Sequence, residues 1–421
     1  MFKKVIYNTG AQVIGKATTA TITLLITLII GRTLGPAGYG DFTKIFVFVG
    51  YFYTLADFGL NAIYIKIAKE NELPHLKSLL GLRIIIGVTL ALIATVSGFL
   101  LPYDQAASTG FSPLVKVGIA IASITIITQA LYLTANAFYQ KILRYDLSTI
   151  SAAVSYVFVL LTAALVTFTS KSLLGYTIAY PIGGFILVLV AFAIIKKRTK
   201  TLPTPTFSKK EVIKFAKPAW PVGLALIFNL IYFRIDVFIL SNYRPSTEVG
   251  LYGLAYQFFE AALAIPIFFS NAIYPPLANF YKVSRQRFQK EVKNWLFILS
   301  GVSILLTITM FSVSFFISAI FGRNFEGSMP ALQILSIGLP FFFISALLWH
   351  LLIIYDKQKY LTLIYAVGAV FNIIANLIFI PTYGYIAASI ITVISEALIT
   401  LLLVIAIRSK NNLTMKQFNN Y

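Results

Sequence analysis

Cysteine is absent from the 421-residue chain, and histidine occurs only twice, at His75 and His350. The absence of cysteine excludes disulfides, thiolate metal sites and catalytic thiols, and it leaves the redox compartment open. The sequence also contains no HExxH pair, nucleophile elbow or P-loop, so it favours neither a hydrolase nor an ATP-driven machine. We therefore expect a protein that is not an enzyme and that has no cofactor and no metal site.

Charged residues are scarce as well, since they make up 11% of the chain whereas 58% is hydrophobic. This balance excludes an ordinary soluble domain and predicts a polytopic membrane protein. The formal net charge of +20 is typical of nucleic-acid binding, but here the basic residues lie in short segments between apolar runs, where they set membrane orientation. We expect no nucleic-acid partner. The first apolar run is too long for a signal peptide and carries Gln12 and Lys16, so it is predicted to be a spanning helix.

Long apolar runs fill the rest of the chain, and a run of roughly 20 residues is enough to cross a bilayer. We predict an all-α polytopic membrane protein with twelve transmembrane helices, near residues 10–32, 42–65, 78–100, 114–139, 148–168, 172–195, 218–242, 249–274, 295–320, 330–354, 360–380 and 384–407. If the termini and the even-numbered loops share one face, that face holds most of the 34 basic residues, with Arg83 counted among them. The positive-inside rule then places both termini in the cytoplasm of a bacterial or archaeal cell, with the chain in the cytoplasmic membrane.

The chain divides near its middle at residues 196–217, a basic segment with a Pro/Thr centre that is predicted to be a cytoplasmic linker. Ser208 and Glu211 form a capping box, so residues 208–217 are predicted to form a short surface helix. The motif NAIY at 61–64 recurs at 271–274, and two further residue pairs recur at nearly the same spacing. We predict two six-helix bundles, 1–195 and 218–421, related by a pseudo-two-fold axis along the membrane normal and enclosing a central cavity suited to alternating access.

Two charges interrupt the seventh predicted span, in the stretch 218–242. Arg234 and Asp236 stand in its second half, where an unpaired charge costs about 2.5–3.5 kcal/mol on insertion scales. Residues two apart do not meet on a helix, so each needs a partner from another helix, from water or from a ligand. A structural ion pair and a ligand contact both stay open for these residues.

Polar side chains recur at helical spacing in several spans, as expected of helix faces that line a wet lumen. Interhelical hydrogen bonding is the alternative for any one stripe taken alone. Because six such stripes exceed what packing requires, we favour a water-filled lumen. Its predicted polar and aromatic residues are Gln12, Tyr53, Asn61, Gln129, Asn136, Asn229, Gln257, Asn372 and Asn376.

The charges of the predicted lumen indicate what it binds. Arg234 as a planar fork and Lys16 as a point charge suit a pyrophosphate, while tyrosines and amides suit sugar rings. Carboxylates in a partly desolvated lumen are suited to carry protons, and the predicted coupling carboxylates are Asp57, Asp236, Glu260 and Glu396. A permanent salt bridge to Lys16 or Arg234 is the alternative role for each of them.

Three further segments are distinctive: Gly31-Arg32-Thr33-Leu34-Gly35-Pro36-Ala37-Gly38-Tyr39-Gly40, Ala56-Asp57-Phe58-Gly59-Leu60 and Phe233-Arg234-Ile235-Asp236. Together they resemble the polysaccharide-transport (O-antigen flippase) family of the multidrug/oligosaccharidyl-lipid/polysaccharide exporter superfamily. The resemblance implies a transporter that moves undecaprenyl-pyrophosphate-linked oligosaccharide from the inner to the outer leaflet, coupled to an ion gradient with H⁺ or Na⁺ as the candidate ions. It gives residues 32–40 a structural role at the external turn, and it makes Arg234 the best candidate for contacting the pyrophosphate.

Two other interpretations are carried forward. A drug or cation exporter of the same superfamily resembles this chain in outline, but it favours an anionic cavity, and Lys16 in the first span argues against one. Lipid II flippases are similar too but have two further spans. A noncatalytic scaffold of a glycan-assembly complex would not need a charged, polar interior. Besides the lipid-linked oligosaccharide and membrane lipids, a glycan polymerase or assembly complex is a candidate partner.

Overall fold

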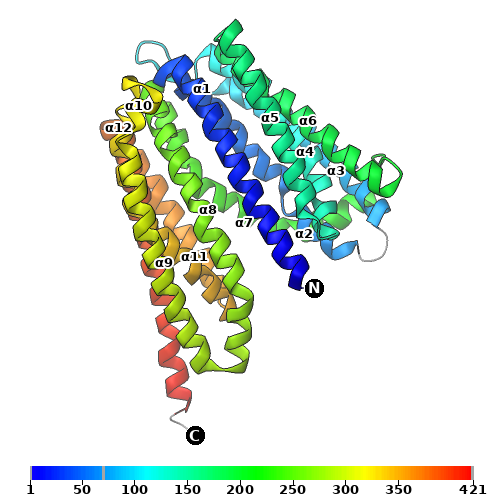
Figure 1. Ribbon diagram of the computed structural model, residues 1–421, viewed down its shortest axis with the longest axis vertical. Helices are drawn as coiled ribbons and strands as arrows, with labels where there is room; N and C mark the ends of the chain where they lie inside the picture. Colours follow the sequence, from blue (N-terminus) through cyan, green and yellow to red (C-terminus); the bar gives the residue numbers. More distant parts are fainter. Residues whose placement is uncertain (1, 69–71, 419–421) are drawn as a thin grey trace. The chain divides into compact units, whose positions relative to one another are not determined.

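The computed structural model describes residues 2–68 and 72–418; the side chains of residues 2–14, 72, 209–212, 221–222, 224–233 and 409–418 lie outside that description. The described elements are helices, apart from a short antiparallel hairpin of β1 (Tyr103–Asp104) and β2 (Thr109–Gly110) and a 3-10 turn, η1 (Arg323–Phe325) (Figure 1). The helices are α1 (Phe2–Asp57), α2 (Leu60–Ile67), α3 (Glu72–Leu100), α4 (Pro113–Lys141), α5 (Tyr145–Thr169), α6 (Leu173–Thr199), α7 (Lys209–Tyr243), α8 (Ser246–Val283), α9 (Arg285–Ser314), α10 (Ile317–Phe321), α11 (Ser328–Ile354) and α12 (Gln358–Phe418).

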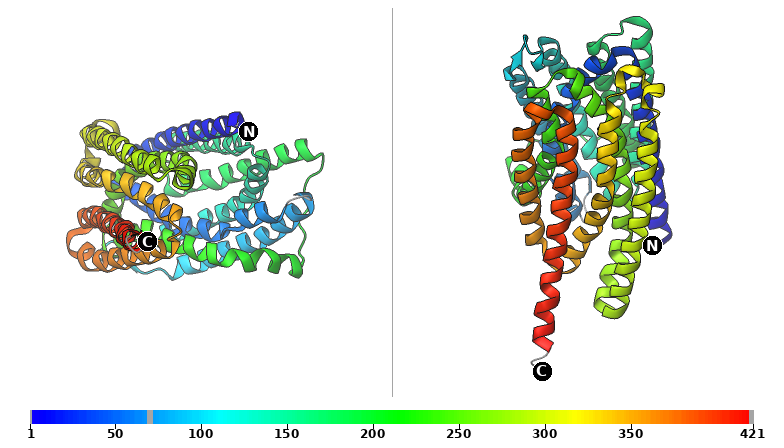
Figure 2. Two further views of the ribbon diagram at one scale, coloured as in Figure 1. Left: turned by 90° about the horizontal axis from the view of Figure 1, so that it is seen from below. Right: turned by 90° about the vertical axis from the view of Figure 1, so that its left-hand side faces the viewer.

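Two of these helices contain a break at a glycine with positive φ. Gly35 in α1 has φ 66° and Gly384 in α12 has φ 61°, a conformation that residues with a Cβ rarely adopt. The segments of α12 before and after Gly384 run side by side (Figure 2). α1 has 56 residues and α12 has 61, and at 1.5 Å per residue either is long enough to cross the hydrocarbon core twice.

Within the searched, described part of the chain, nine helices are long and apolar enough to cross a membrane. Two of these nine are the broken helices α1 and α12, and α7, with 35 residues, is also long enough for one crossing. The architecture is therefore consistent with the predicted twelve spans. It confirms the prediction of an all-α, polytopic membrane protein.

The chain forms two compact units, and the first comprises Met1–Leu230 together with Arg244–Gly250. In this unit α3 packs on α4, α5 packs on α1 and α6, and α4 also contacts α6. A buried apolar cluster that includes Leu79, Phe138 and Phe215 fills the end of the unit near α2. The β hairpin is fixed by Lys44, which is buried in α1 and donates to the carbonyl oxygen of Gly110 at 2.7 Å.

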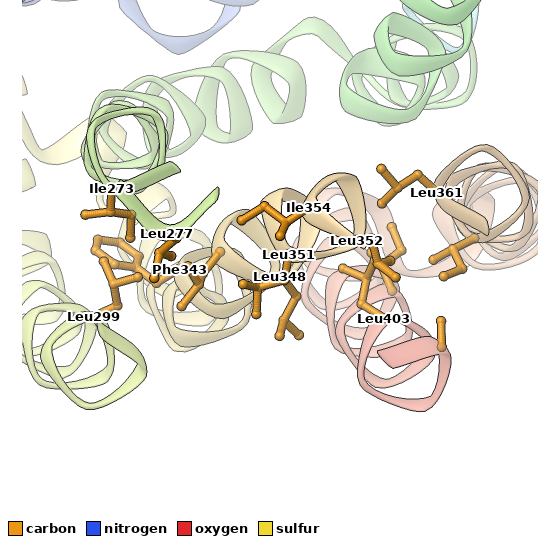
Figure 3. Close-up of a cluster of buried hydrophobic side chains, with 14 of the residues drawn as sticks. Ile273, Leu277, Leu299, Phe343, Leu348, Leu351, Leu352, Ile354, Leu361 and Leu403 are labelled. Atoms are coloured by element: carbon orange, nitrogen blue, oxygen red, sulfur yellow. The ribbon is translucent and has the colours of Figure 1, made fainter. Parts of the chain in front are cut away.

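The second unit comprises Ile231–Tyr243 and Leu251–Tyr421. α11 lies at its centre and packs against both α9 and α12. Figure 3 shows the apolar cluster that joins them, in which Leu348 and Leu351 lie between Leu299 on one side and Leu403 on the other. Because this core is continuous from α8 to α12, the polar side chains described below are held on a packed framework.

The predicted domain limits, 1–195, 196–217 and 218–421, stay predictions. The contact-based units divide within α7 instead and assign Arg244–Gly250 to the first unit. The predicted surface helix at 208–217 is not a separate element, because residues 209–217 are the beginning of α7 and continue into it without a break. The capping box marked the start of this helix, because α7 begins at Lys209, directly after Ser208, but it carries no information about where the helix ends.

In the first unit, the α1 segment after Gly35 crosses the start of α8 with almost no space between the backbones. A Cβ on Gly40 would lie 1.7 Å from the carbonyl oxygen of Ser246, and one on Gly250 would lie 1.9 Å from that of Pro36. Ser246 also donates its hydroxyl to the Asp41 carboxylate at 2.5 Å. The glycines of the GPAGYG segment therefore have the structural role that the family resemblance implies.

We expect Gly40→Ala to lower the thermal unfolding midpoint of the detergent-purified protein by several degrees, because the new methyl group would push apart two backbones that cannot rotate away. Gly50→Ala, in the same helix, is the control. A Cβ there meets nothing within 4 Å, so this change should be neutral or slightly stabilising. Equal midpoints for the two variants would show that the crossing is not tight in solution.

Candidate functional site

Arg234, in the second half of α7, is held by two side chains of α8. Its guanidinium Nη2 lies 2.5 Å from Glu260 Oε2, and its Cζ lies 4.9 Å from the centre of the Tyr256 ring. The Arg234 side chain is 29% exposed and that of Glu260 is 48% exposed. Arg234 is therefore an oriented but accessible cation, and it forms the salt bridge that the sequence left open as the alternative role of Glu260.

Asp236 lies two residues further along and has different partners, as the helical spacing required. It is only 3% exposed, and it accepts hydrogen bonds from the Tyr252 hydroxyl of α8, from Thr392 of α12 at 3.4 Å and from the Val237 amide at 2.7 Å. A buried carboxylate with three donors is satisfied without a cation. It links α7, α8 and α12 within the second unit.

A second buried carboxylate, Glu396, lies on α12 one helical turn after Thr392. It is 2% exposed and accepts a hydrogen bond from Ser345 of α11. On the facing half of α12, Asn372 donates to Ser395 at 3.0 Å, and Asn376 donates to Asn372 at 2.9 Å. Asp236, Glu396 and these amides form what we call the polar core of the second unit, which comprises Asp236, Tyr252, Ser345, Asn372, Asn376, Thr392, Ser395 and Glu396.

The polar core corrects the interpretation of these stripes as walls of an open lumen. Asn372 and Asn376 are buried and bonded within one unit, so they act as interhelical hydrogen-bonding residues, the alternative that sequence spacing left open. One group differs, because the Asn376 Oδ1 is buried without a hydrogen-bond partner among the described residues. That oxygen can still accept a hydrogen bond or bind a cation.

In the first unit, Asp57 is paired rather than free. Arg83 of α3 donates from Nη2 to Asp57 Oδ1 at 3.1 Å and to Asn61 Oδ1 at 2.7 Å. Arg83 is 0% exposed, whereas the Asp57 side chain is 33% exposed. The pair spans the break between α1 and α2, where Phe58 and Gly59 both have positive φ. Counting Arg83 with the residues of the cytoplasmic face was therefore wrong: it is a buried cation that joins two helices.

Two of the remaining predicted residues, Tyr53 and Asn136, also make contacts within their unit. Tyr53 hydrogen-bonds Thr125 of α4 at 2.5 Å, and Asn136 accepts from Ser148 of α5 at 2.7 Å. Gln129 and Gln257 are half-buried. Lys16 is exposed and has no ion-pair partner in the part of the chain that the structure describes. The side chains of Gln12 and Asn229 lie outside the described residues.

Sequence reasoning missed Arg83, Tyr252 and Ser345. Arg83 carried a signal that could have revealed it, because it stands inside an apolar run, and Asp57 and Asn61 lie four residues apart on one helix face. Tyr252 and Ser345 carried none, since serine and tyrosine are frequent in spanning helices of this chain and their partners lie 16 and 51 residues away.

The arrangement of these helices matches solved transporters. The chain aligns with the lipid II flippase MurJ in an inward closed conformation at a TM-score of 0.75, with 17% identity, covering 96% of this chain and 87% of that one. It aligns with an inward-facing multidrug resistance MATE family transporter at a TM-score of 0.72, with 11% identity, covering 94% and 96%. The chain therefore has the multi-pass fold of these two structures.

Sequence comparisons identify the family within that class. The family model described as "Polysaccharide biosynthesis protein" matches residues 2–281, and a MatE model matches residues 221–378. A putative O-antigen transporter of Shigella dysenteriae is 23% identical over 290 residues, covering 67% of this chain and 72% of that one. An uncharacterized membrane protein of Methanocaldococcus jannaschii is 23% identical over 418 residues, covering 89% and 78%.

The chain belongs to the polysaccharide biosynthesis protein family of transporters, which confirms the resemblance found in the sequence. The activities named among these matches are transport and flipping. They agree with the expectation that the chain is not an enzyme.

We expect substitution of Asp57 and substitution of Arg83 to lower the free energy of unfolding by different amounts. Asp57→Asn leaves a fully buried guanidinium without its counter-charge and should destabilise by about 3–5 kcal/mol, whereas Arg83→Met leaves a carboxylate that water partly reaches and should destabilise less. Thermal unfolding of both single variants and the double variant measures this. If Asp57→Asn proves as stable as the parent protein, the pair is not holding the α1–α2 break together.

Proposed function

We propose that this protein is a flippase that moves undecaprenyl-pyrophosphate-linked oligosaccharide, the repeat unit of an O-antigen, capsule or exopolysaccharide, from the inner to the outer leaflet by alternating access. The observation that carries the proposal is Arg234, a cation that is oriented on α7 and still accessible in a chain of the polysaccharide biosynthesis family. A guanidinium presents paired donors that match phosphate oxygens, which is the chemistry that a pyrophosphate headgroup requires.

Glu260 then acts as the resident counter-ion of this site. In the part of the chain described, only Nη2 of Arg234 has a hydrogen-bond partner, so its other donors are available to a phosphate oxygen. When the headgroup arrives, its oxygens replace or share the position of the Glu260 carboxylate, and when it leaves the carboxylate returns. Tyr256 keeps the guanidinium plane fixed during this exchange through its ring face. Lys16, exposed on α1, is the second proposed cation for the headgroup.

Ion coupling is assigned to the polar core of the second unit. Asp236 accepts hydrogen bonds from neutral donors, with the charge of Arg234 acting on it through space, and Glu396 accepts one from Ser345, so an incoming H⁺ or Na⁺ would bind at carboxylates that hydroxyl groups orient. The Asn376 Oδ1, which has no hydrogen-bond partner among the described residues, lies on the same helix as Glu396 and adds an acceptor. Asp57 is a weaker candidate than expected, because Arg83 already neutralises it.

Export of a cationic drug is the second candidate, and the MatE match over residues 221–378, the segment that holds Asp236 and Glu260, favours it. The two functions differ in what Glu260 does, since a drug would bind the carboxylate and a pyrophosphate would bind the arginine. We also propose that the protein lies in the cytoplasmic membrane with both termini in the cytoplasm. A glycan polymerase or assembly complex is its proposed partner.

We expect Arg234→Ala to abolish glycan export in a strain that lacks its own flippase, and Arg234→Lys to restore it only in part, because the planar fork is lost. Accumulation of the lipid-linked glycan on the inner leaflet is the measurement. Arg244→Ala is the control, because this change removes the same charge from an arginine with a similar environment. Arg244 pairs with Glu248 four residues on, and its side chain is 30% exposed. Full export by Arg234→Ala would reject the headgroup role, and loss of drug resistance without loss of export would favour the second candidate.

We expect Asp236→Asn to remove the dependence of transport on an ion gradient while the protein still folds, because the amide keeps an acceptor for Tyr252 but carries no charge. Lipid-linked glycan movement in proteoliposomes would be followed under a pH gradient, a Na⁺ gradient and neither. If the parent protein transports equally fast under all three conditions, the proposed ion coupling is wrong. If Asp236→Asn responds to the gradient as the parent protein does, Asp236 is not the coupling site.

A further inference from the structure

A cavity of about 510 Å³ lies in the first unit at the N-terminal end of α3, and its lining includes none of the residues assigned to transport. Its polar lining consists of His75, Lys77, Ser78, Thr201, Thr206 and Ser208, and two apolar residues complete it. The three threonine and serine residues after position 200 belong to residues 200–208, which we call the linker strap; it connects α6 to α7 and runs beside the start of α3 (Figure 1).

The linker strap is attached to α3 by specific contacts. The Thr206 amide donates to the carbonyl oxygen of Lys77 at 3.1 Å, and the Thr206 hydroxyl lies 3.1 Å from that of Ser78. Gly81 makes this approach feasible, because a Cβ there would lie 2.1 Å from the Thr206 carbonyl oxygen. The wall of the cavity is therefore built by the fold, and its hydroxyl groups hold defined positions.

The lining has a positive character. None of the described lining residues is acidic, and Lys77 has no ion-pair partner among the residues that the structure describes. His75 is held edge-on to the Phe215 ring, with 6.5 Å between the ring centres. One ammonium beside several hydroxyls matches a ligand that has one phosphate and several hydroxyls.

We propose that this cavity binds a phosphate ester of a polyol. Its volume falls within the range of about 300–1,000 Å³ that small-ligand sites occupy, and it is larger than a bare phosphate needs. Two sources present this chemistry on the face that the basic-residue count assigns to the cytoplasm. One is the headgroup of a glycerol-based anionic phospholipid, and the other is a soluble glycerol or sugar phosphate. The site is separate from Arg234, so it does not depend on the transported substrate.

Binding would be measured on the full-length protein after delipidation in a neutral detergent. Native mass spectrometry would count bound phosphatidylglycerol against phosphatidylcholine, and thermal shift would titrate glycerol 3-phosphate against glycerol. We expect Lys77→Ala, and also Lys77→Gln, which keeps a polar side chain without the charge, to weaken phosphate-ester binding about tenfold, since one charge-assisted contact is lost. Lys197→Ala is the matched control: Lys197 is exposed at the end of α6, outside the cavity lining, and should change binding less than twofold.

The outcomes separate the sources and the alternatives. Phosphatidylglycerol binding that glycerol 3-phosphate does not displace identifies a lipid site, and displacement by millimolar glycerol 3-phosphate identifies a site open to soluble esters. Equal weakening by Lys77→Ala and Lys197→Ala would mean diffuse attraction to a basic surface and would overturn the proposal. The proposal would also be overturned if the parent protein, shown to be folded by its thermal unfolding transition, bound the phosphate esters no better than phosphatidylcholine and glycerol.

Discussion

The dominant constraint on this protein is that a charge inside an apolar helix bundle must be neutralised or hydrogen-bonded before the helix can stay there. Moving an ion from water into a low-dielectric interior costs several kcal/mol even after relaxation. The structure meets this requirement differently at each site. Lys44 uses a backbone carbonyl, Arg83 uses a carboxylate and an amide, and Asp236 uses hydroxyl donors. Each of these contacts therefore also ties together elements that are apart in the sequence.

The two arginine–carboxylate pairs show how exposure separates a structural role from a binding role. In the Arg83–Asp57 pair the guanidinium is 0% exposed, so no ligand reaches it without opening the unit. In the Arg234–Glu260 pair both side chains are reachable by solvent, at 29% and 48%. Where water reaches such a pair, it contributes little to stability. This exposure supports the proposal that the Arg234–Glu260 pair exchanges with a ligand.

The sequence predicted the helical membrane fold, the turn at Gly35 and the separate partners of Arg234 and Asp236, because each follows from hydropathy, backbone sterics or helical spacing. It did not predict which polar stripes would be buried. Asn372 and Asn376 have the same spacing whether they face water or Ser395, and only the neighbouring helix decides between the two. Arg83 was misassigned for a related reason, since a basic residue near a span end satisfies the positive-inside rule regardless of its direction.

The contrast between the two units extends to how their carboxylates are compensated. In the first unit Asp57 is matched by a full positive charge, so adding a proton or a sodium ion there would leave Arg83 unbalanced in a buried position. In the second unit the hydrogen bonds that Asp236 and Glu396 accept come from hydroxyl groups and a backbone amide, and Arg234 acts on Asp236 only through space. A hydroxyl can rotate when the charge of its partner changes, whereas a buried guanidinium cannot lose its charge. This difference, rather than the number of carboxylates, supports the proposal that a coupling ion binds in the second unit.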